Sequence, residues 1–137
     1  MKIYEFLEEL KILYLPYEEY AVFGSGPLAI KGIRECKGLD IIVTPELWTD
    51  LSGRFKVSQN SSGMWLIKRK NIEIYKEWSA PFDKKEDVTS LIDIAEMIEN
   101  AGGVRFVRLE DVIAWKKTKG RKKDIKDLRM IEEYKKG

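Results

Sequence analysis

The chain has 137 residues, of which 44% are hydrophobic and 35% are charged, and its formal net charge is +2. This composition predicts one folded domain with one core, and excludes a disordered chain. The net charge is too small to indicate nucleic-acid binding by itself. A single cysteine, Cys36, and the absence of histidine exclude an internal disulfide framework and a metal site of the Cys/His type.

The first residues include acidic side chains where a signal peptide needs an apolar run, and no apolar stretch reaches membrane-spanning length. We therefore expect a cytoplasmic protein with no membrane partner. Many Lys and Glu residues, beside Gln59 as the single glutamine, are a weak compositional sign of a thermophilic source.

The first part of the chain predicts alternating helices and strands. The predicted helices are residues 3–14, 27–31 and 45–53, and the predicted strands are residues 21–23 and 39–43. Pro16 lies beyond the end of the first helix, because proline is poorly tolerated in a helix interior. Thr44 is a good N-cap for the third helix, with Pro45 at its first position and Gly53 at its end.

The second part predicts further strands and then two helices. The predicted strands are residues 55–57, 64–67, 72–75 and 104–107, and the predicted helices are residues 109–119 and 121–136. Residues 58–63 are predicted to form a turn, 78–86 an irregular stretch, and 88–98 either strand or helix. Gly120 is expected to close the first of the two helices. The last helix is predicted to bury Ile125, Leu128, Ile131 and Tyr134.

The order of these elements predicts an α+β (α/β-like) fold, with a mixed β-sheet and helices packed on it. We interpret residues 1–137 as one domain. Its core spans about residues 18–108, and a C-terminal helical element spans about residues 109–136.

Gly24 and Ser25 follow the first predicted strand and precede a helix. A glycine turn at a helix N-terminus can bind phosphate, because free backbone N–H groups point outward there. The alternative is an ordinary strand-to-helix turn, where these residues are common.

Two carboxylates lie within apolar strands. Asp40 stands among apolar neighbours, so it needs a hydrogen-bonding partner, a cation or an exposed strand end. Glu73 alternates with Ile72 and Ile74, and can simply face solvent. If the two strands are neighbours, the carboxylates converge and form a hard oxygen site of the kind that binds Mg²⁺ with phosphates.

A third cluster is basic and surrounds Gly120; its members are Lys116, Lys117, Lys119, Arg121, Lys122 and Lys123. It can bind a triphosphate or an RNA backbone, or it can be a solvated helix face. We favour Lys117, Arg121 and Lys122 as ligand-binding residues, because they flank the predicted turn.

Taken together, these motifs resemble the DNA polymerase beta-type nucleotidyltransferase superfamily. The residues that carry the resemblance are Gly24-Ser25, Gly32-Ile33-Arg34, Asp40, Glu73 and the C-terminal run from Gly120 through Asp124 to Leu128. The resemblance spans roughly residues 18–134 and implies the nucleotidyltransferase fold. The C-terminal run is similar in particular to that of small prokaryotic members of this superfamily.

The resemblance implies transfer of a nucleoside monophosphate from an NTP to a hydroxyl acceptor, with Mg²⁺. Gly24 and Ser25 would bind phosphate. Asp40 and Glu73 would be catalytic residues and metal ligands. The partners implied are a nucleotide and an acceptor or protein of unspecified identity.

Gly38 departs from the pattern, because the superfamily carries an Asp-x-Asp pair and Gly38 stands at its first position. A lost ligand weakens metal binding and lowers the rate. Glu35 and Asp50 are candidate substitutes. Two functions therefore stay open: an active transferase, or a non-catalytic protein that binds a nucleotide or a partner. Family analogy alone suggests a third possibility, that the protein is one component of a toxin–antitoxin pair.

Overall fold

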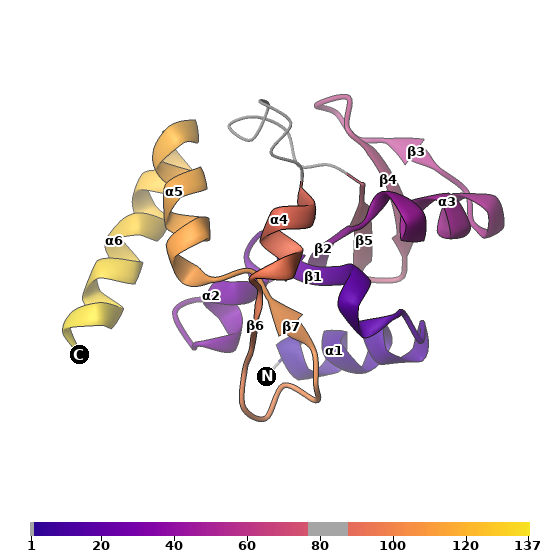
Figure 1. Ribbon diagram of the computed structural model, residues 1–137. Helices are drawn as coiled ribbons and strands as arrows, with labels where there is room; N and C mark the ends of the chain where they lie inside the picture. Colours follow the sequence, from indigo (N-terminus) through magenta and orange to yellow (C-terminus); the bar gives the residue numbers. More distant parts are fainter. Residues whose placement is uncertain (1, 77–87) are drawn as a thin grey trace.

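The computed structural model describes residues 2–76 and 88–137, which form a mixed β-sheet with helices packed on both faces (Figure 1). The helices of this part are α1 (Lys2–Ile12), α2 (Gly26–Ile30), α3 (Pro45–Arg54), α4 (Val88–Asp93), α5 (Leu109–Lys119) and α6 (Lys122–Lys136), with a short 3₁₀ helix, η1, at Tyr17–Glu19. The strands are β1 (Tyr20–Phe23), β2 (Leu39–Val43), β3 (Ser58–Gln59), β4 (Trp65–Arg69), β5 (Ile72–Tyr75), β6 (Glu96–Met97) and β7 (Arg105–Phe106).

The seven strands lie in the order β3-β4-β5-β2-β1-β7-β6. Strand β2 pairs in parallel with β5 and antiparallel with β1, and β1 pairs in parallel with β7. Strand β2 is therefore central, and its apolar residues are fully buried from both sides. A strand that is covered on both faces is rich in apolar residues on both sides, which explains Leu39 and the run Ile41-Ile42-Val43; Asp40 is the exception.

Helices from different parts of the chain cover the two faces. Helices α1 and α3 bury Phe6, Leu10 and Leu51 against the side of the sheet that carries Ile41 and Ile74. Helices α4, α5 and α6 cover the opposite face, where the core residues are Phe23, Leu28, Ile42, Ile92, Val112, Trp115 and Ile131. The apolar face of α1 follows the predicted helical spacing, so local pattern and tertiary packing agree there.

Helices α5 and α6 form a hairpin at one end of the sheet (Figure 1). Gly120 ends α5 in the left-handed conformation, with φ of 60° and its N–H donating to the carbonyl of Lys116. Glycine adopts this conformation without the steric cost of a side chain. The chain therefore turns at Gly120, and α6 packs against α5.

Most of the predicted elements are confirmed, and three predictions are corrected. The strand predicted at 55–57 lies instead at β3, inside the predicted turn, where it pairs with β4. The prediction for 88–98 resolves into α4 and β6. The predicted irregular stretch, 78–86, lies outside the described residues.

The third correction concerns the inward face of α6. Ile131 is buried as predicted, but Ile125 and Tyr134 are 47% and 44% exposed. Asp124 and Asp127 are buried in their place. Ionic contacts with α5 and the loop after α2 rotate this helix away from the orientation that apolar periodicity alone predicts.

None of the helices within residues 2–76 and 88–137 combines the length and apolar character that a bilayer-spanning segment requires.

Candidate functional site

Asp40 on β2 and Glu73 on β5 are register partners across two parallel strands. Side chains at paired positions project from the same face of a sheet, so the two carboxylates converge. Burial, and secondarily the charge of Glu73, raise the pKa of Asp40 from 3.8 to about 6, while Lys123 and Lys68 act in the opposite direction. Asp40 therefore has a raised proton affinity, and a nearby cation stabilises its ionised form.

Glu73 is held by two neighbours on the sheet. The hydroxyl of Tyr75 donates to Glu73 Oε1 at 2.6 Å, and Lys68 Nζ lies 3.6 Å from Glu73 Oε2. Tyr75 is two residues further along the same strand, and Lys68 is the cross-strand partner on β4. Burial, with this hydrogen bond to Glu73 next in weight, raises the pKa of Tyr75, which keeps the hydroxyl protonated as a donor.

The Gly24-Ser25 turn lies directly against Asp40. Gly24 has φ of +64°, and a Cβ atom placed there would lie 2.7 Å from Asp40 Oδ2. Glycine is thus required both for the backbone conformation and for the close approach of the carboxylate. Ser25 then precedes α2, which is a helix of only five residues.

Two cavities, each of about 340 Å³, flank the carboxylate pair. The first, which we call the basic cavity, is lined by Gly24, Ser25, Arg34, Asp40, Asn60, Ser62, Met64, Tyr75, Trp115, Lys116, Lys119, Arg121, Lys123 and Asp127. The second, the strand-end cavity, is lined by Ser25, Lys37, Gly38, Asp40, Lys68, Asn71 and Glu73. Ser25 and Asp40 belong to both, so the turn and the carboxylate stand between them.

Only some residues of the predicted basic cluster line the basic cavity. Arg121 lines it, but Lys117 lines a separate depression of about 300 Å³ formed by residues of α5 and α6. Lys122 is exposed at the start of α6 and is not a lining residue of either cavity. Lys119 and Lys123 line the basic cavity instead.

Sequence reasoning did not select Arg34, Lys116, Tyr75 or Asp127 as site residues, although all four line the basic cavity. A usable signal existed for Lys116, because it lies four residues after the buried Val112 and therefore on the inward face of α5. Arg34 and Asp127 lie within the motifs that carry the family resemblance, but no local pattern indicated their contact, since 93 residues separate the two side chains.

Gly38 is a glycine for a steric reason. The N–H of its neighbour Leu39 donates to the carbonyl oxygen of Asn71 at 2.9 Å, and a Cβ at Gly38 would lie 2.7 Å from that same oxygen. A side chain at this position requires the β2–β5 backbone pairing to shift. The two candidate substitutes, Glu35 and Asp50, are both exposed and line neither cavity.

The donor set at the pair is therefore two carboxylates. Within residues 2–76 and 88–137, no group of three or more carboxylate or thiol side chains is arranged to hold a metal ion. Mg²⁺ commonly binds through one or two carboxylates together with water and substrate phosphates. Asp40 and Glu73 supply the two carboxylates that this mode uses for one ion.

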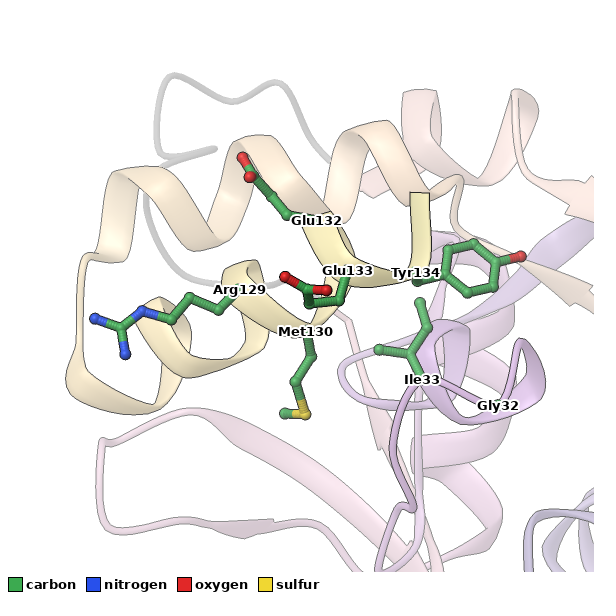
Figure 2. A pocket seen from close by; sticks show the side chains of 7 residues that line it. All are labelled: Gly32, Ile33, Arg129, Met130, Glu132, Glu133 and Tyr134. Carbon is green, nitrogen blue, oxygen red and sulfur yellow. The ribbon is translucent and has the colours of Figure 1, made fainter. Parts of the chain in front are cut away.

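A larger cavity, of about 580 Å³, lies between α6 and the loop after α2 and contains none of the predicted site residues (Figure 2). Its lining residues are Gly32, Ile33, Arg129, Met130, Glu132, Glu133 and Tyr134. The side chains of Arg129 and Glu132 extend away from Ile33, which leaves a shallow rim rather than converging polar groups (Figure 2). The basic cavity is the better candidate site, because charged groups and a carboxylate converge there.

Comparisons with models of protein families, with curated proteins and with solved structures give no significant match.

Proposed function

We propose that this chain is a nucleotidyltransferase-like protein that binds a nucleoside triphosphate together with Mg²⁺. The observation that carries the proposal is the register pairing of Asp40 with Glu73 beside the Gly24-Ser25 turn. The predicted phosphate turn and the predicted metal ligands adjoin one another, although they come from three separate segments of the chain.

The charges of the basic cavity support a polyanionic ligand. Its lining includes five cationic side chains against two carboxylates. The cations are Arg34, Lys116, Lys119, Arg121 and Lys123. A triphosphate satisfies several of them at once, and Mg²⁺ at Asp40 neutralises the end of the triphosphate that approaches the carboxylates. The volume of about 340 Å³ lies within the range of about 300–1,000 Å³ typical of small-molecule sites.

The proposal includes the nucleotidyltransferase fold. It is supported by the sequence order of the Gly24-Ser25 turn, the Asp40 strand and the Glu73 strand, with β2 and β5 adjacent and parallel. The C-terminal run from Gly120 to Leu128 adds support, since its turn borders the basic cavity through Arg121 and Lys123.

Two carboxylates, rather than three, favour binding over rapid catalysis. The steric conflict between a side chain at Gly38 and the Asn71 carbonyl argues against the missing ligand being accommodated on this backbone. Without it, the two-metal arrangement that stabilises both the attacking and the leaving oxygen lacks a protein ligand. We therefore propose Mg²⁺-dependent nucleotide binding as the principal function.

A second candidate is slow transfer of a nucleoside monophosphate, and the strand-end cavity favours it. That cavity places Glu73 next to space for an acceptor, on the other side of Asp40 from the basic cavity. In this reaction an acceptor hydroxyl attacks the α-phosphorus, the bond to the bridging oxygen breaks, and pyrophosphate leaves. Glu73 would take the hydroxyl proton, and bound Mg²⁺ would supply charge stabilisation.

Titration calorimetry with ATP, GTP, CTP and UTP tests binding, in MgCl₂ and in EDTA. We expect one or more nucleotides to bind in MgCl₂, and Asp40→Asn to weaken that binding about tenfold or more. Asp50→Asn is the matched control, because it changes charge equally at an exposed residue of α3. Equal affinities for wild type and Asp40→Asn, or no binding of any nucleotide, would contradict the proposal.

Transfer is tested separately, with α-labelled NTP, Mg²⁺ or Mn²⁺ and a cell extract as the source of acceptors. A labelled product that disappears with Glu73→Gln supports the second candidate. Nucleotide binding without any labelled product leaves the principal function standing and excludes this transfer.

A further inference from the structure

A cluster of buried ions joins α5, α6 and the loop after α2. Lys116 is 4% exposed, Asp124 is 0% exposed and Asp127 is 4% exposed. Lys116 Nζ donates to Asp127 Oδ2 at 2.9 Å and lies 3.7 Å from Asp124 Oδ1. Ionised groups so far from water require compensation from partners, because desolvation costs each of them several kcal/mol.

Asp127 also holds Arg34, which comes from a distant part of the sequence. Arg34 Nε lies 2.9 Å from Asp127 Oδ1, and Arg34 Nη2 donates to Asp127 Oδ2 at 3.2 Å. A third nitrogen, Nη1, donates to the carbonyl of Glu35. One carboxylate thus fixes the guanidinium and the ammonium group side by side on the wall of the basic cavity.

The cluster has more positive than negative charge. Arg121 pairs with Asp124 through Nε at 2.6 Å and Nη2 at 3.1 Å, so three cations share two carboxylates. The three cations are Arg34, Lys116 and Arg121. Among the hydrogen bonds of the described residues, those of Lys116 and Arg34 leave further N–H donors on both groups. Because these cations line the basic cavity, an anion that enters it is attracted by the excess positive charge.

We infer that Arg34 and Lys116 form an oxyanion subsite for a phosphate or pyrophosphate group, and that Asp127 is the positioning residue that builds it. The inference rests on the proposed function, since it assigns the phosphate end of a ligand to one wall of the same cavity. It differs in needing no metal ion, because the donors are N–H groups and the attraction is between fixed charges. The Asp40–Glu73 pair contributes nothing to this subsite.

The role of Asp127 has a signature that charge alone does not produce. Asp127→Asn removes a negative charge from the cavity wall, so simple electrostatics predicts tighter anion binding. Loss of the shared carboxylate instead allows Arg34 and Lys116 to separate. Binding must then order two long side chains, and this entropic cost lowers the affinity. The subsite therefore predicts weaker binding in Asp127→Asn, in the direction opposite to the charge effect.

The test is calorimetry of the full chain with pyrophosphate in EDTA at low salt. We expect wild type to bind, and Arg34→Lys, Lys116→Met and Asp127→Asn each to bind about tenfold more weakly. The matched controls are Lys126→Met and Glu132→Gln, exposed residues of α6 with the same charge changes, and they should stay within about twofold.

Circular dichroism and thermal unfolding accompany each titration, because Lys116→Met and Asp127→Asn remove partners of buried charges. Arg34→Lys keeps the charge at a side chain that is 34% exposed, so it tests the subsite even if the other two variants do not fold. A purely structural cluster predicts lower unfolding temperatures with unchanged pyrophosphate affinity in the folded variants.

Three outcomes would overturn the inference: no pyrophosphate binding by wild type, unchanged affinity in Arg34→Lys, or unchanged or tighter binding in Asp127→Asn. Failure of the proposed function gives a different result. In that case Asp40→Asn leaves binding of the Mg²⁺–nucleotide unchanged, while pyrophosphate still binds in EDTA and still depends on Arg34.

Discussion

Asp40 and Glu73 are paired in register on the parallel strands β2 and β5, and each has a further close neighbour. Gly24 approaches Asp40 closely enough that only a hydrogen atom fits, and Tyr75 donates to Glu73 at 2.6 Å. Two half-buried carboxylates this close repel one another when both are ionised, so the pair favours the binding of a proton or a cation.

The first prediction concerns stability and pH. Because burial and Glu73 raise the pKa of Asp40 from 3.8 to about 6, the folded protein holds a proton that the unfolded chain releases. The contribution of Asp40 to stability is therefore fully present below about pH 4 and is lost as the pH rises through about 6. We expect Asp40→Asn to raise the free energy of unfolding at pH 8 by about 1–3 kcal/mol, with little gain at pH 4.

Urea unfolding at both pH values, followed by circular dichroism, measures this difference. Asp50→Asn on the exposed face of α3 is the control and should change neither value appreciably. A destabilised Asp40→Asn at pH 8 would show that the ionised carboxylate is stabilised by contacts stronger than its burial cost.

The second prediction concerns metal binding and pH. A divalent cation binds the ionised form of Asp40 and so competes with its proton. With the pKa raised to about 6, affinity for Mn²⁺ should fall below pH 6 by up to about tenfold per pH unit and level off above pH 7. Calorimetric titration with Mn²⁺ in the presence of nucleotide, from pH 5 to pH 8, follows the change. An affinity that is flat across this range argues that Asp40 is not a ligand.

The third prediction concerns Gly38. Gly38→Ala places a methyl group 2.7 Å from the carbonyl oxygen of Asn71, and the β2–β5 pairing must open to accommodate it. We expect a loss of about 1–3 kcal/mol in the free energy of unfolding. Gly53→Ala in α3 is the contrasting variant, because a Cβ there has no neighbour within 4 Å and alanine favours a helix by about 0.5–1 kcal/mol.

Urea unfolding of the two alanine variants should therefore give changes of opposite sign. The same geometry predicts that Gly38→Asp does not complete a metal site on the unchanged backbone. A stable Gly38→Asp protein with stronger Mn²⁺ binding would refute the steric explanation.

The fourth prediction concerns Tyr75. Tyr75→Phe removes the hydroxyl that donates to Glu73 at 2.6 Å, and the carboxylate loses a fixed partner. We expect a loss of about 1–2 kcal/mol in stability, together with weaker Mn²⁺ binding because Glu73 is less well oriented. Tyr14→Phe, at a side chain that is 88% exposed, serves as the control for thermal unfolding and calorimetry. Unchanged metal affinity in Tyr75→Phe would remove Tyr75 from the site.

Local sequence was sufficient for most of the elements, and it singled out Asp40, Glu73, Gly24 and Ser25 as candidate site residues. Strand β2 was predictable because four of its five residues are apolar. Thr44 marks the start of α3, because its side-chain oxygen accepts a hydrogen bond from the Leu47 N–H. The short strand β3 was not predictable, since two residues carry no period and its pairing with β4 decides its position.

The sequence by itself therefore determined the mixed α+β character of the chain and the two strands that carry carboxylates, because hydrophobic period and turn chemistry are local properties. Tertiary structure alone decided that Asp40 and Glu73 are neighbours, since strand order depends on pairing between distant segments. It also decided which cations face the cavity. Lys117 is exposed and lines a separate depression formed by residues of α5 and α6, while Lys116 is buried and donates to Asp127, a partner that no local pattern reveals.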